Sequence, residues 1–195
     1  NANLFQIYLS DQQSTLPEGL RQCREDFKFH FSQYSYHFLN QESLRDFVAS
    51  VYGGDVLWAY DLLKPYAYKA DLGRYCLLYA YGGWYADITL KFLAGAPLLG
   101  ETQLIYFYDH GNGPAVSGHF CQNGLFYAQK GLPLLAELIE AVVKHCKQRY
   151  HGPTALSPTD PGLFGEHIAR YVPQHGMHNG YFMQLTPHHE QKNRA

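Results

Sequence analysis

Long apolar runs and a marked excess of charge of either sign are both missing from this sequence of 195 residues. No stretch approaches the roughly 20 apolar residues needed to cross a bilayer, and the richest run, Tyr75 to Tyr85, is interrupted by Gly82 and Gly83. The 15 Lys and Arg residues nearly balance the 17 Asp and Glu residues, for a formal net charge of -2. This balance supplies no general field for a polyanion, so we expect no nucleic-acid partner.

The sequence also has no C-x-x-C pair, and we recognise no signal peptide in it. Its four cysteines are far apart, which predicts reduced thiols in a cytosolic protein. No basic segment followed by an apolar one marks a signal peptide. The chain begins with Asn1-Ala2 and stops shortly after His188 and His189. We therefore expect that native residues are missing, at the C-terminal end in particular.

Tyrosine is abundant: there are 17 Tyr residues, against two Met and two Trp. Tyrosine rings can stack on sugars or bases and donate a hydrogen bond, but they can equally fill a core with their hydroxyl groups turned outward. Composition alone favours the core. The 46% of hydrophobic residues excludes disorder, and the length favours one domain that covers 1–195.

Strand and helix signals alternate along the chain. Phe27 to Phe31, for example, alternates apolar and polar residues with the period of a strand. The expected strands cover 4–9, 27–31, 84–90 and 103–109, and the expected helices cover 17–26, 43–52, 56–79 with a break at Pro65, 133–150 and 163–171. This alternation predicts an α/β fold with a largely parallel sheet. Ligands bind at the carboxyl ends of strands in such sheets, here near 8–10, 87–89 and after 109.

The segment from residue 70 to 89 carries the most chemical information. Asp71 and Arg74 are three residues apart and share one helix face. Gly82-Gly83 ends that helix, and Asp87 and Thr89 follow on one side of the expected strand. Oxygen ligands beside a guanidinium group suit a divalent cation with a diphosphate. A surface ion pair with a strand-end Asp in a turn fits the same spacing equally well.

The order of these residues resembles the DXD-motif sugar-binding glycosyltransferases. This family includes initiating-mannosyltransferase-like proteins, bacterial capsular-polysaccharide enzymes and the clostridial glucosylating toxins. The shared pattern is an Asp-x-x-Arg helix, a Leu-Tyr pair, Gly-Gly, an aromatic residue and then Asp-x-Asp. The resemblance extends over about Leu4 to Tyr171, through Phe5-Gln6-Ile7-Tyr8, the stretch from Cys121 to Pro133 and the loop Pro158 to Gly162.

The resemblance implies a GT-A-type fold with a Rossmann-like, mainly parallel sheet flanked by helices. It also implies a retaining glycosyltransferase that uses a nucleotide-diphosphate sugar. Asp87, Asp71 and Arg74 would be the catalytic residues, and Asp71 and Arg74 would hold the sugar hydroxyl groups and the phosphate. Tyr8 would stack on the base. Tyr85 and Asn123 would complete the nucleotide-sugar site.

The family's metal ion, Mn²⁺ or Mg²⁺, would be held by Asp87 and Thr89, with His188 as a late ligand. Two positions depart from the family pattern. Thr89 replaces the second acid of the motif, and a hydroxyl group is a weaker metal ligand than a carboxylate. Asp160 replaces the glycine of the Thr-Gly-Pro loop. These departures keep open an alternative, a catalytically degenerate transferase-like module that binds a carbohydrate or a nucleotide.

Two other classes fit less well. A His-dependent metallohydrolase would need a spacing such as HExxH, which none of the histidines provides. The loop from Gly111 to Gly113 lacks the third glycine of a dinucleotide-binding turn and leads into Pro114. Under the resemblance, the partners are a nucleotide-sugar donor and a glycan or lipid-linked glycan acceptor. We expect a cytoplasmic protein, associated peripherally with the inner face of a membrane if the acceptor is lipid-linked.

Overall fold

Helices and strands alternate along the chain much as the sequence predicts. The computed structural model of the protein describes residues 2–11, 16–92, 94–95, 102–109, 121–152, 158–159, 161–175 and 178–182. The strands are β1 (Asn3–Ile7), β2 (Ser35–Leu39), β3 (Gly83–Ala86), β4 (Leu104–Asp109), β5 (Cys121–Ala128) and β6 (His178–Phe182). The helices are α1 (Glu18–His30), α2 (Gln41–Val51), α3 (Gly54–Leu62), α4 (Tyr66–Tyr81), α5 (Pro133–Gln148) and α6 (Pro161–His175).

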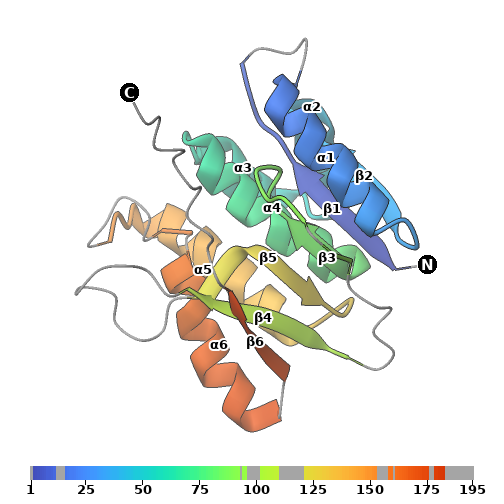
Figure 1. The fold of residues 1–195 in the computed structure, drawn as a ribbon. Coiled ribbons are helices and arrows are strands. Elements are labelled where there is room, and N and C mark those ends of the chain that lie inside the picture. Colours follow the sequence, from blue (N-terminus) through green and yellow to red (C-terminus); the bar gives the residue numbers. More distant parts are fainter. Residues whose placement is uncertain are drawn as a thin grey trace, which may run out of the picture.

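The described strands form one sheet in the order β2-β1-β3-β5-β4-β6 (Figure 1). β1 pairs in parallel with both β2 and β3, and β4 pairs in parallel with β6. β5 is antiparallel to β3 and to β4, so it alone runs against the other described strands. The predicted α/β class and mainly parallel sheet are therefore confirmed. Because β5 is reversed, its first residues lie at the edge of the sheet where β1 and β3 end.

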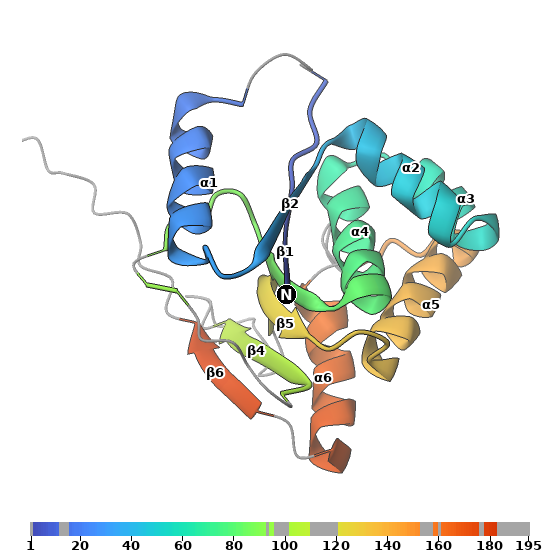
Figure 2. The same ribbon diagram turned by 90° about the vertical axis from the view of Figure 1, so that its right-hand side faces the viewer.

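The helices are divided unequally between the two faces of the sheet. α1 packs on one face, where its Phe27 joins Leu4 and Trp84 in a small apolar cluster. The other helices cover the opposite face, where Phe5 and Tyr85 enter the larger core (Figure 2). Successive side chains of a strand point to opposite faces, which explains why neighbouring residues of β1 and β3 belong to different clusters. The main core therefore lies between the sheet and the helices α2 to α6.

The strand predicted at 27–31 is wrong, because these residues end helix α1 and β2 begins only at Ser35. The alternation of Phe27, Phe29 and Phe31 suits a strand, but Phe27 and Phe31 are also four residues apart and can share a helix face. Their rings lie 4.7 Å apart between centroids in the apolar cluster. Phe29 is 77% exposed, so the helix buries two of the three rings.

Helix α4 and the two glycines after it bring the central strand into place. Pro65 precedes the helix, and Gly82 ends it with a φ of 66°. A Cβ atom on Gly82 would lie 2.5 Å from the backbone nitrogen of Lys130, and one on Gly83 would lie 2.2 Å from the carbonyl oxygen of Asn3. Only glycine fits such close backbone contacts. The pair therefore sets β3 tightly between β1 and β5.

The strand predicted at 84–90 is shorter than expected. β3 ends at Ala86. The amide of Asp87 then donates one further hydrogen bond of 2.7 Å to the carbonyl oxygen of Gly124 on β5. The amide of Leu90 then donates to the carbonyl oxygen of Asp87, which closes a turn. β2, β5 and β6 are further strands that the sequence patterns do not predict.

Two other features bear on the sequence-based expectations. All four cysteines are free, and three of them, Cys76, Cys121 and Cys146, are buried. Burial raises the pKa of the Cys76 thiol, so this side chain stays protonated in the core. Of the helices that the structure describes, none is long and apolar enough to cross a membrane.

Candidate active site

Polar side chains from three elements meet at the edge of the sheet where β1 and β3 end. Asp87 directly follows β3, and Asn123 lies near the start of the reversed β5. Asp71 and Arg74 reach this edge from the middle of α4, which packs against β1, β3 and β5. The sequence-based prediction that Asp71, Arg74 and Asp87 lie together is confirmed. They form one buried cluster with Asn123 (the Arg74 cluster).

Arg74 is the centre of this cluster. Its Nη2 lies 3.2 Å from Oδ1 of Asp71 and 3.3 Å from Oδ1 of Asp87. Its Nη1 donates a 2.6 Å hydrogen bond to the carbonyl oxygen of Asn123. The guanidinium carbon also lies 4.5 Å from the centroid of the Tyr85 ring, within the range of a cation–π contact. Arg74 is only 4% exposed, so the protein itself surrounds its charge.

The two carboxylates keep this buried cation charged. Burial disfavours a charged guanidinium group, but the negative charges of Asp87 and Asp71 outweigh that effect and hold the pKa of Arg74 above its ordinary value. The same guanidinium group thus offsets two acids that would otherwise repel each other. A single buried cation therefore joins the helix α4 to the turn after β3.

Asp71 is the more deeply buried acid. Its Oδ1 accepts a 3.0 Å hydrogen bond from the side-chain amide of Asn123, and its Oδ2 accepts one of 2.7 Å from the hydroxyl group of Thr159. Burial raises the pKa of Asp71 to about 6, although Arg74 and both hydrogen bonds favour the ionised form. Asp71 is therefore ionised at neutral pH and takes up a proton near pH 6.

Asp87 is the acid that faces solvent. Its side chain is 41% exposed, and its Oδ1 accepts a 2.8 Å hydrogen bond from the hydroxyl group of Tyr85. Its Oδ2 lies beside Gly124, where an added Cβ atom would be only 2.6 Å away. The absence of a side chain on Gly124 therefore leaves room for Oδ2. Among the described residues, none makes a hydrogen bond or ion pair with this oxygen, so it is the carboxylate oxygen best placed to meet a ligand.

Of the remaining predicted site residues, Tyr85 contacts the Arg74 cluster, whereas Thr89 and Tyr8 are not part of it. Thr89 is exposed in the turn after β3, so the argument that a strand holds it on the same side as Asp87 is wrong. Tyr8 is half-buried just after β1, where its amide donates to the carbonyl oxygen of Leu39. Tyr85 is buried, and the guanidinium group of Arg74 lies over its ring. His188 lies outside the described residues, as does Asp160.

Tyr75 and Gly124 also belong to the site, although the sequence argument gave them no role. The hydroxyl group of Tyr75 accepts a 3.2 Å hydrogen bond from Asn123 and donates one of 3.1 Å to the carbonyl oxygen of Thr159. Tyr75 is four residues after Asp71, a helical spacing that could have indicated its position. Thr159 lies in the loop that resembles a family loop, but no sequence pattern indicates its contact with Asp71.

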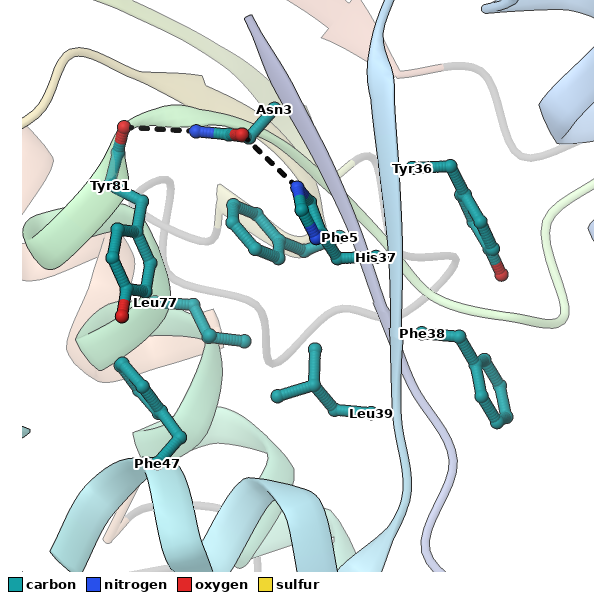
Figure 3. A pocket seen from close by; sticks show the side chains of 9 residues that line it. All are labelled: Asn3, Phe5, Tyr36, His37, Phe38, Leu39, Phe47, Leu77 and Tyr81. Atoms are coloured by element: carbon teal, nitrogen blue, oxygen red, sulfur yellow. Dashed lines mark hydrogen bonds between the residues drawn. The ribbon is translucent and has the colours of Figure 1, made fainter. Parts of the chain in front are cut away.

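The structure also has an aromatic pocket of about 550 Å³ near the start of β1 (Figure 3). The ring of Phe5 lies between the rings of His37 and Tyr81. The distance between ring centroids is 5.0 Å to His37 and 6.2 Å to Tyr81. Asn3 links two sides of the rim: its Nδ2 donates to the carbonyl oxygen of Tyr81, and its Oδ1 accepts a hydrogen bond from Nε2 of His37. This pocket lies by the C-terminal part of α4, beyond Asp71 and Arg74.

Three residues of the Arg74 cluster, Asp71, Arg74 and Asp87, lie in a segment that matches a known family. Residues 17–101 match the model of a family described as the glycosyltransferase sugar-binding region containing DXD motif. An uncharacterized glycosyltransferase of Acanthamoeba polyphaga mimivirus is 31% identical over 88 residues, which are 45% of this chain and 34% of that protein. The solved structure of PaToxG glycosyltransferase aligns with a TM-score of 0.70 and 15% identity over 89% of this chain and 69% of that one.

Over residues 17–101, the chain is similar to the sugar-binding region of DXD-motif glycosyltransferases. Its fold is one that a solved glycosyltransferase shares, as the predicted GT-A type requires. Asp71, Arg74 and Asp87 all lie inside the matched segment. The chain spans about a third of the length of the curated relative, 34%. The viral origin of that relative gives no support to the bacterial, capsular setting that the sequence resemblance implied.

Proposed function

We propose that this protein transfers a sugar from a nucleotide-diphosphate donor to a hydroxyl group of an acceptor, with retention of the anomeric configuration. The observation that carries this proposal is the Arg74 cluster. It joins Asp71, Arg74 and Asp87 at the sheet edge where ligands of such folds bind, inside the segment that matches the sugar-binding family. The acceptor that we propose is a glycan, free or lipid-linked, in the cytoplasm or at its membrane.

The residues present fit a divalent cation only when a ligand helps to hold it. In the part of the chain that the structure describes, no three His, Cys, Asp or Glu side chains gather as a metal site. Asp87 offers Oδ2, while its Oδ1 is engaged by Tyr85 and Arg74. Mn²⁺ and Mg²⁺ need about six oxygen ligands. We therefore propose that Asp87, with Thr89 as a weaker partner, holds the ion together with the diphosphate.

In this proposal the protein's own groups position the donor. Asp87 and the Arg74 charge behind it set the electrostatic field at the diphosphate, and a bound divalent ion supplies positive charge to the leaving phosphate. Asn123 contacts the sugar, and Tyr8 stacks on the base. The buried positions of Asp71 and Arg74 support a role in fixing the shape of the site as well as in binding. We assign no nucleophile.

A thermal-shift screen tests the donor and the metal together. We expect Mn²⁺ alone to leave the melting temperature nearly unchanged, because Asp87 offers too few ligands. A UDP- or GDP-linked sugar with Mn²⁺ should raise the melting temperature, since a ligand present at about 100 times its Kd adds about 2.7 kcal/mol to stability. A CMP-linked sugar, which carries one phosphate, should give a smaller shift. Equal shifts for all three donors would contradict a diphosphate site.

Release of the nucleotide diphosphate then tests catalysis. Asp87→Asn should abolish metal-dependent release while the fold stays intact, because this side chain is 41% exposed. The matched control is Asp55→Asn, an exposed acid on α3 that pairs with Lys147. It should leave the release rate unchanged. Donor binding without any release of sugar by the unmodified protein would favour the alternative, a degenerate transferase-like binding module.

A further inference from the structure

The side-chain amide of Asn123 is held on its nitrogen side only. Its Nδ2 donates to Oδ1 of Asp71 at 3.0 Å and to the hydroxyl oxygen of Tyr75 at 3.2 Å. An amide nitrogen has two hydrogens, so both are used. Its Oδ1 accepts no hydrogen bond from the described residues, and it is not among their buried polar atoms that lack a partner, so this oxygen reaches the accessible surface of the site. An amide oxygen is an acceptor, so Oδ1 is available to a hydroxyl group of a ligand or to water.

The hydroxyl group of Tyr75 contributes to this orientation. Its hydrogen points to the carbonyl oxygen of Thr159 at 3.1 Å, so its oxygen faces Asn123 as an acceptor. If the amide were turned over, Oδ1 of Asn123 would meet both this oxygen and the carboxylate of Asp71. Two acceptors facing each other are unfavourable. Tyr75 and Asp71 therefore both select the same orientation of the amide.

The ring of Tyr75 holds its hydroxyl group firmly in place. Tyr75 is fully buried, and its ring stacks on that of Phe164 in α6, with 6.0 Å between centroids and 17° between planes. It also lies 6.3 Å from the ring of Phe126 in β5. A buried side chain packed between two elements has little freedom to turn. The amide is thus oriented by groups that are themselves fixed.

We propose that Tyr75 is a positioning residue, which holds the Asn123 amide so that its carbonyl oxygen accepts a hydrogen bond from a hydroxyl group of the donor sugar. This proposal rests on the proposed function, since it takes the ligand at Asn123 to be the sugar part of a nucleotide sugar. It goes further in one respect. The site presents an acceptor at this point, so it selects a sugar with a free hydroxyl group there over its deoxy or O-methyl analogue.

The first test needs no ligand. In ¹⁵N-labelled protein, both side-chain amide protons of Asn123 should exchange slowly with water and have well-separated chemical shifts. In Tyr75→Phe one of them loses its acceptor, and it should exchange at least tenfold faster. The matched control is Tyr60→Phe. Tyr60 is 1% exposed, and its hydroxyl group has no partner among the described residues. Unchanged exchange at Asn123 in Tyr75→Phe would overturn the proposal.

The second test separates the sugar from the nucleotide. Isothermal titration with Mn²⁺ present compares UDP-glucose with UDP, or a GDP-linked sugar with GDP if that donor gives the larger thermal shift. Tyr75→Phe should weaken binding of the nucleotide sugar by about tenfold and leave binding of the nucleotide diphosphate unchanged. Tyr60→Phe should change neither. The two nucleotide sugars that lack the critical hydroxyl group, the deoxy and O-methyl analogues, should bind Tyr75→Phe and the unmodified protein alike.

Two results would contradict the role of Tyr75. An equal loss for nucleotide sugar and nucleotide diphosphate would show a general structural effect, and so would an equal loss in Tyr60→Phe. Failure of the unmodified protein to bind any nucleotide sugar would reject the proposed function, and the sugar contact with it. The amide-exchange measurement would still decide whether Tyr75 orients Asn123, so the two failures can be told apart.

Discussion

Two parts of α4 meet the rest of the protein in opposite ways. The middle of the helix carries Asp71 and Arg74, which are charged and almost completely buried. Its C-terminal part carries Leu77 and Tyr81, which line the aromatic pocket shown in Figure 3. One helix therefore supplies both a charged cluster and an apolar cavity, about two turns apart.

The difference lies in how polar atoms are satisfied. In the Arg74 cluster, charged groups are buried because each one faces a partner from another element. At the aromatic pocket, Asn3 binds backbone carbonyl groups and His37, and stacked rings make up most of the lining. Buried charge is costly unless it is paired, whereas buried rings stabilise without partners. Substitutions at the Arg74 cluster and at the aromatic pocket should therefore have effects of different size, and they should affect stability and donor binding differently.

The largest effect is expected from removing the cation. Arg74→Met leaves the carboxylate of Asp71 buried without its counter-charge, and such a loss costs about 3–5 kcal/mol. Arg74→Lys keeps the positive charge but not the contacts of the planar guanidinium group. It should therefore lose less stability than Arg74→Met. Chemical unfolding measures both variants. If Arg74→Met were as stable as the unmodified protein, the cluster would not depend on this cation.

The next effect concerns pH. The pKa of Asp71 is about 6 in the folded protein, above its ordinary value of 3.8, so the folded state binds this proton more tightly than the unfolded state. This contribution to stability is fully present below about pH 4 and is lost as the pH rises to about 6. It amounts to about 1.4 kcal/mol for each pKa unit of difference.

The difference in unfolding free energy between the unmodified protein and Asp71→Asn isolates this titration. It should change between pH 4 and pH 6 and stay constant from pH 7 to pH 8, because Asn does not titrate. Comparing the two proteins cancels the contributions of other acids, such as Asp61, whose pKa is lowered by its hydrogen bond to Arg45. A difference that stays constant from pH 4 to pH 8 would show that Asp71 keeps its ordinary pKa.

A smaller effect is expected from crowding Asp87. In Gly124→Ala the new methyl group would lie 2.6 Å from Oδ2 of Asp87 and must push the carboxylate aside. Outer-shell changes of this kind weaken metal binding by about tenfold to a hundredfold. Titration of Mn²⁺ in the presence of the nucleotide diphosphate measures this change in metal affinity. The matched control, Gly19→Ala, meets no atom within 4 Å and should bind as the unmodified protein does.

The smallest effect is expected at the aromatic pocket. His37→Ala removes the ring that stacks on Phe5 and one partner of Asn3. The loss of such a ring pair costs about 0.5–1.5 kcal/mol. Binding of the nucleotide sugar should not change, since this pocket lies away from the Arg74 cluster. A clear loss of donor binding in His37→Ala would show that the aromatic pocket and the Arg74 cluster are coupled through α4. The two parts of the helix would then not act independently.

The sequence predicts the centre of the site well because the residues of that centre are close together along the chain. Asp71 and Arg74 are one helical turn apart, and Gly82 and Gly83 have the positive φ values that let the chain turn sharply from the helix into β3. Contacts between distant segments are harder to foresee. Thr159 meets Asp71 across 88 residues, and no periodicity in the sequence connects them. The role of Tyr75 depends on that same distant loop.

The errors in the predicted fold have a similar origin. The Phe27–Phe31 stretch fits a strand by its period of two and a helix by its spacing of four, and packing against Trp84 and Phe92 decides between them. For Thr89, the mistake was to extend β3 through a turn that one hydrogen bond, from Leu90 to Asp87, closes. Local patterns identify candidate residues, but tertiary contacts fix which way they point.

The two glycines before β3 have a consequence for mutational scanning. A side chain at position 82 or 83 would wedge β3 away from the backbone of Lys130 or Asn3. Asp87 sits at the far end of that short strand, so a displaced β3 would carry its carboxylate out of reach of Arg74. A screen for inactive variants should therefore find two intolerant positions that never meet a ligand. Inactivity there would report a shifted strand and not a lost contact with the substrate.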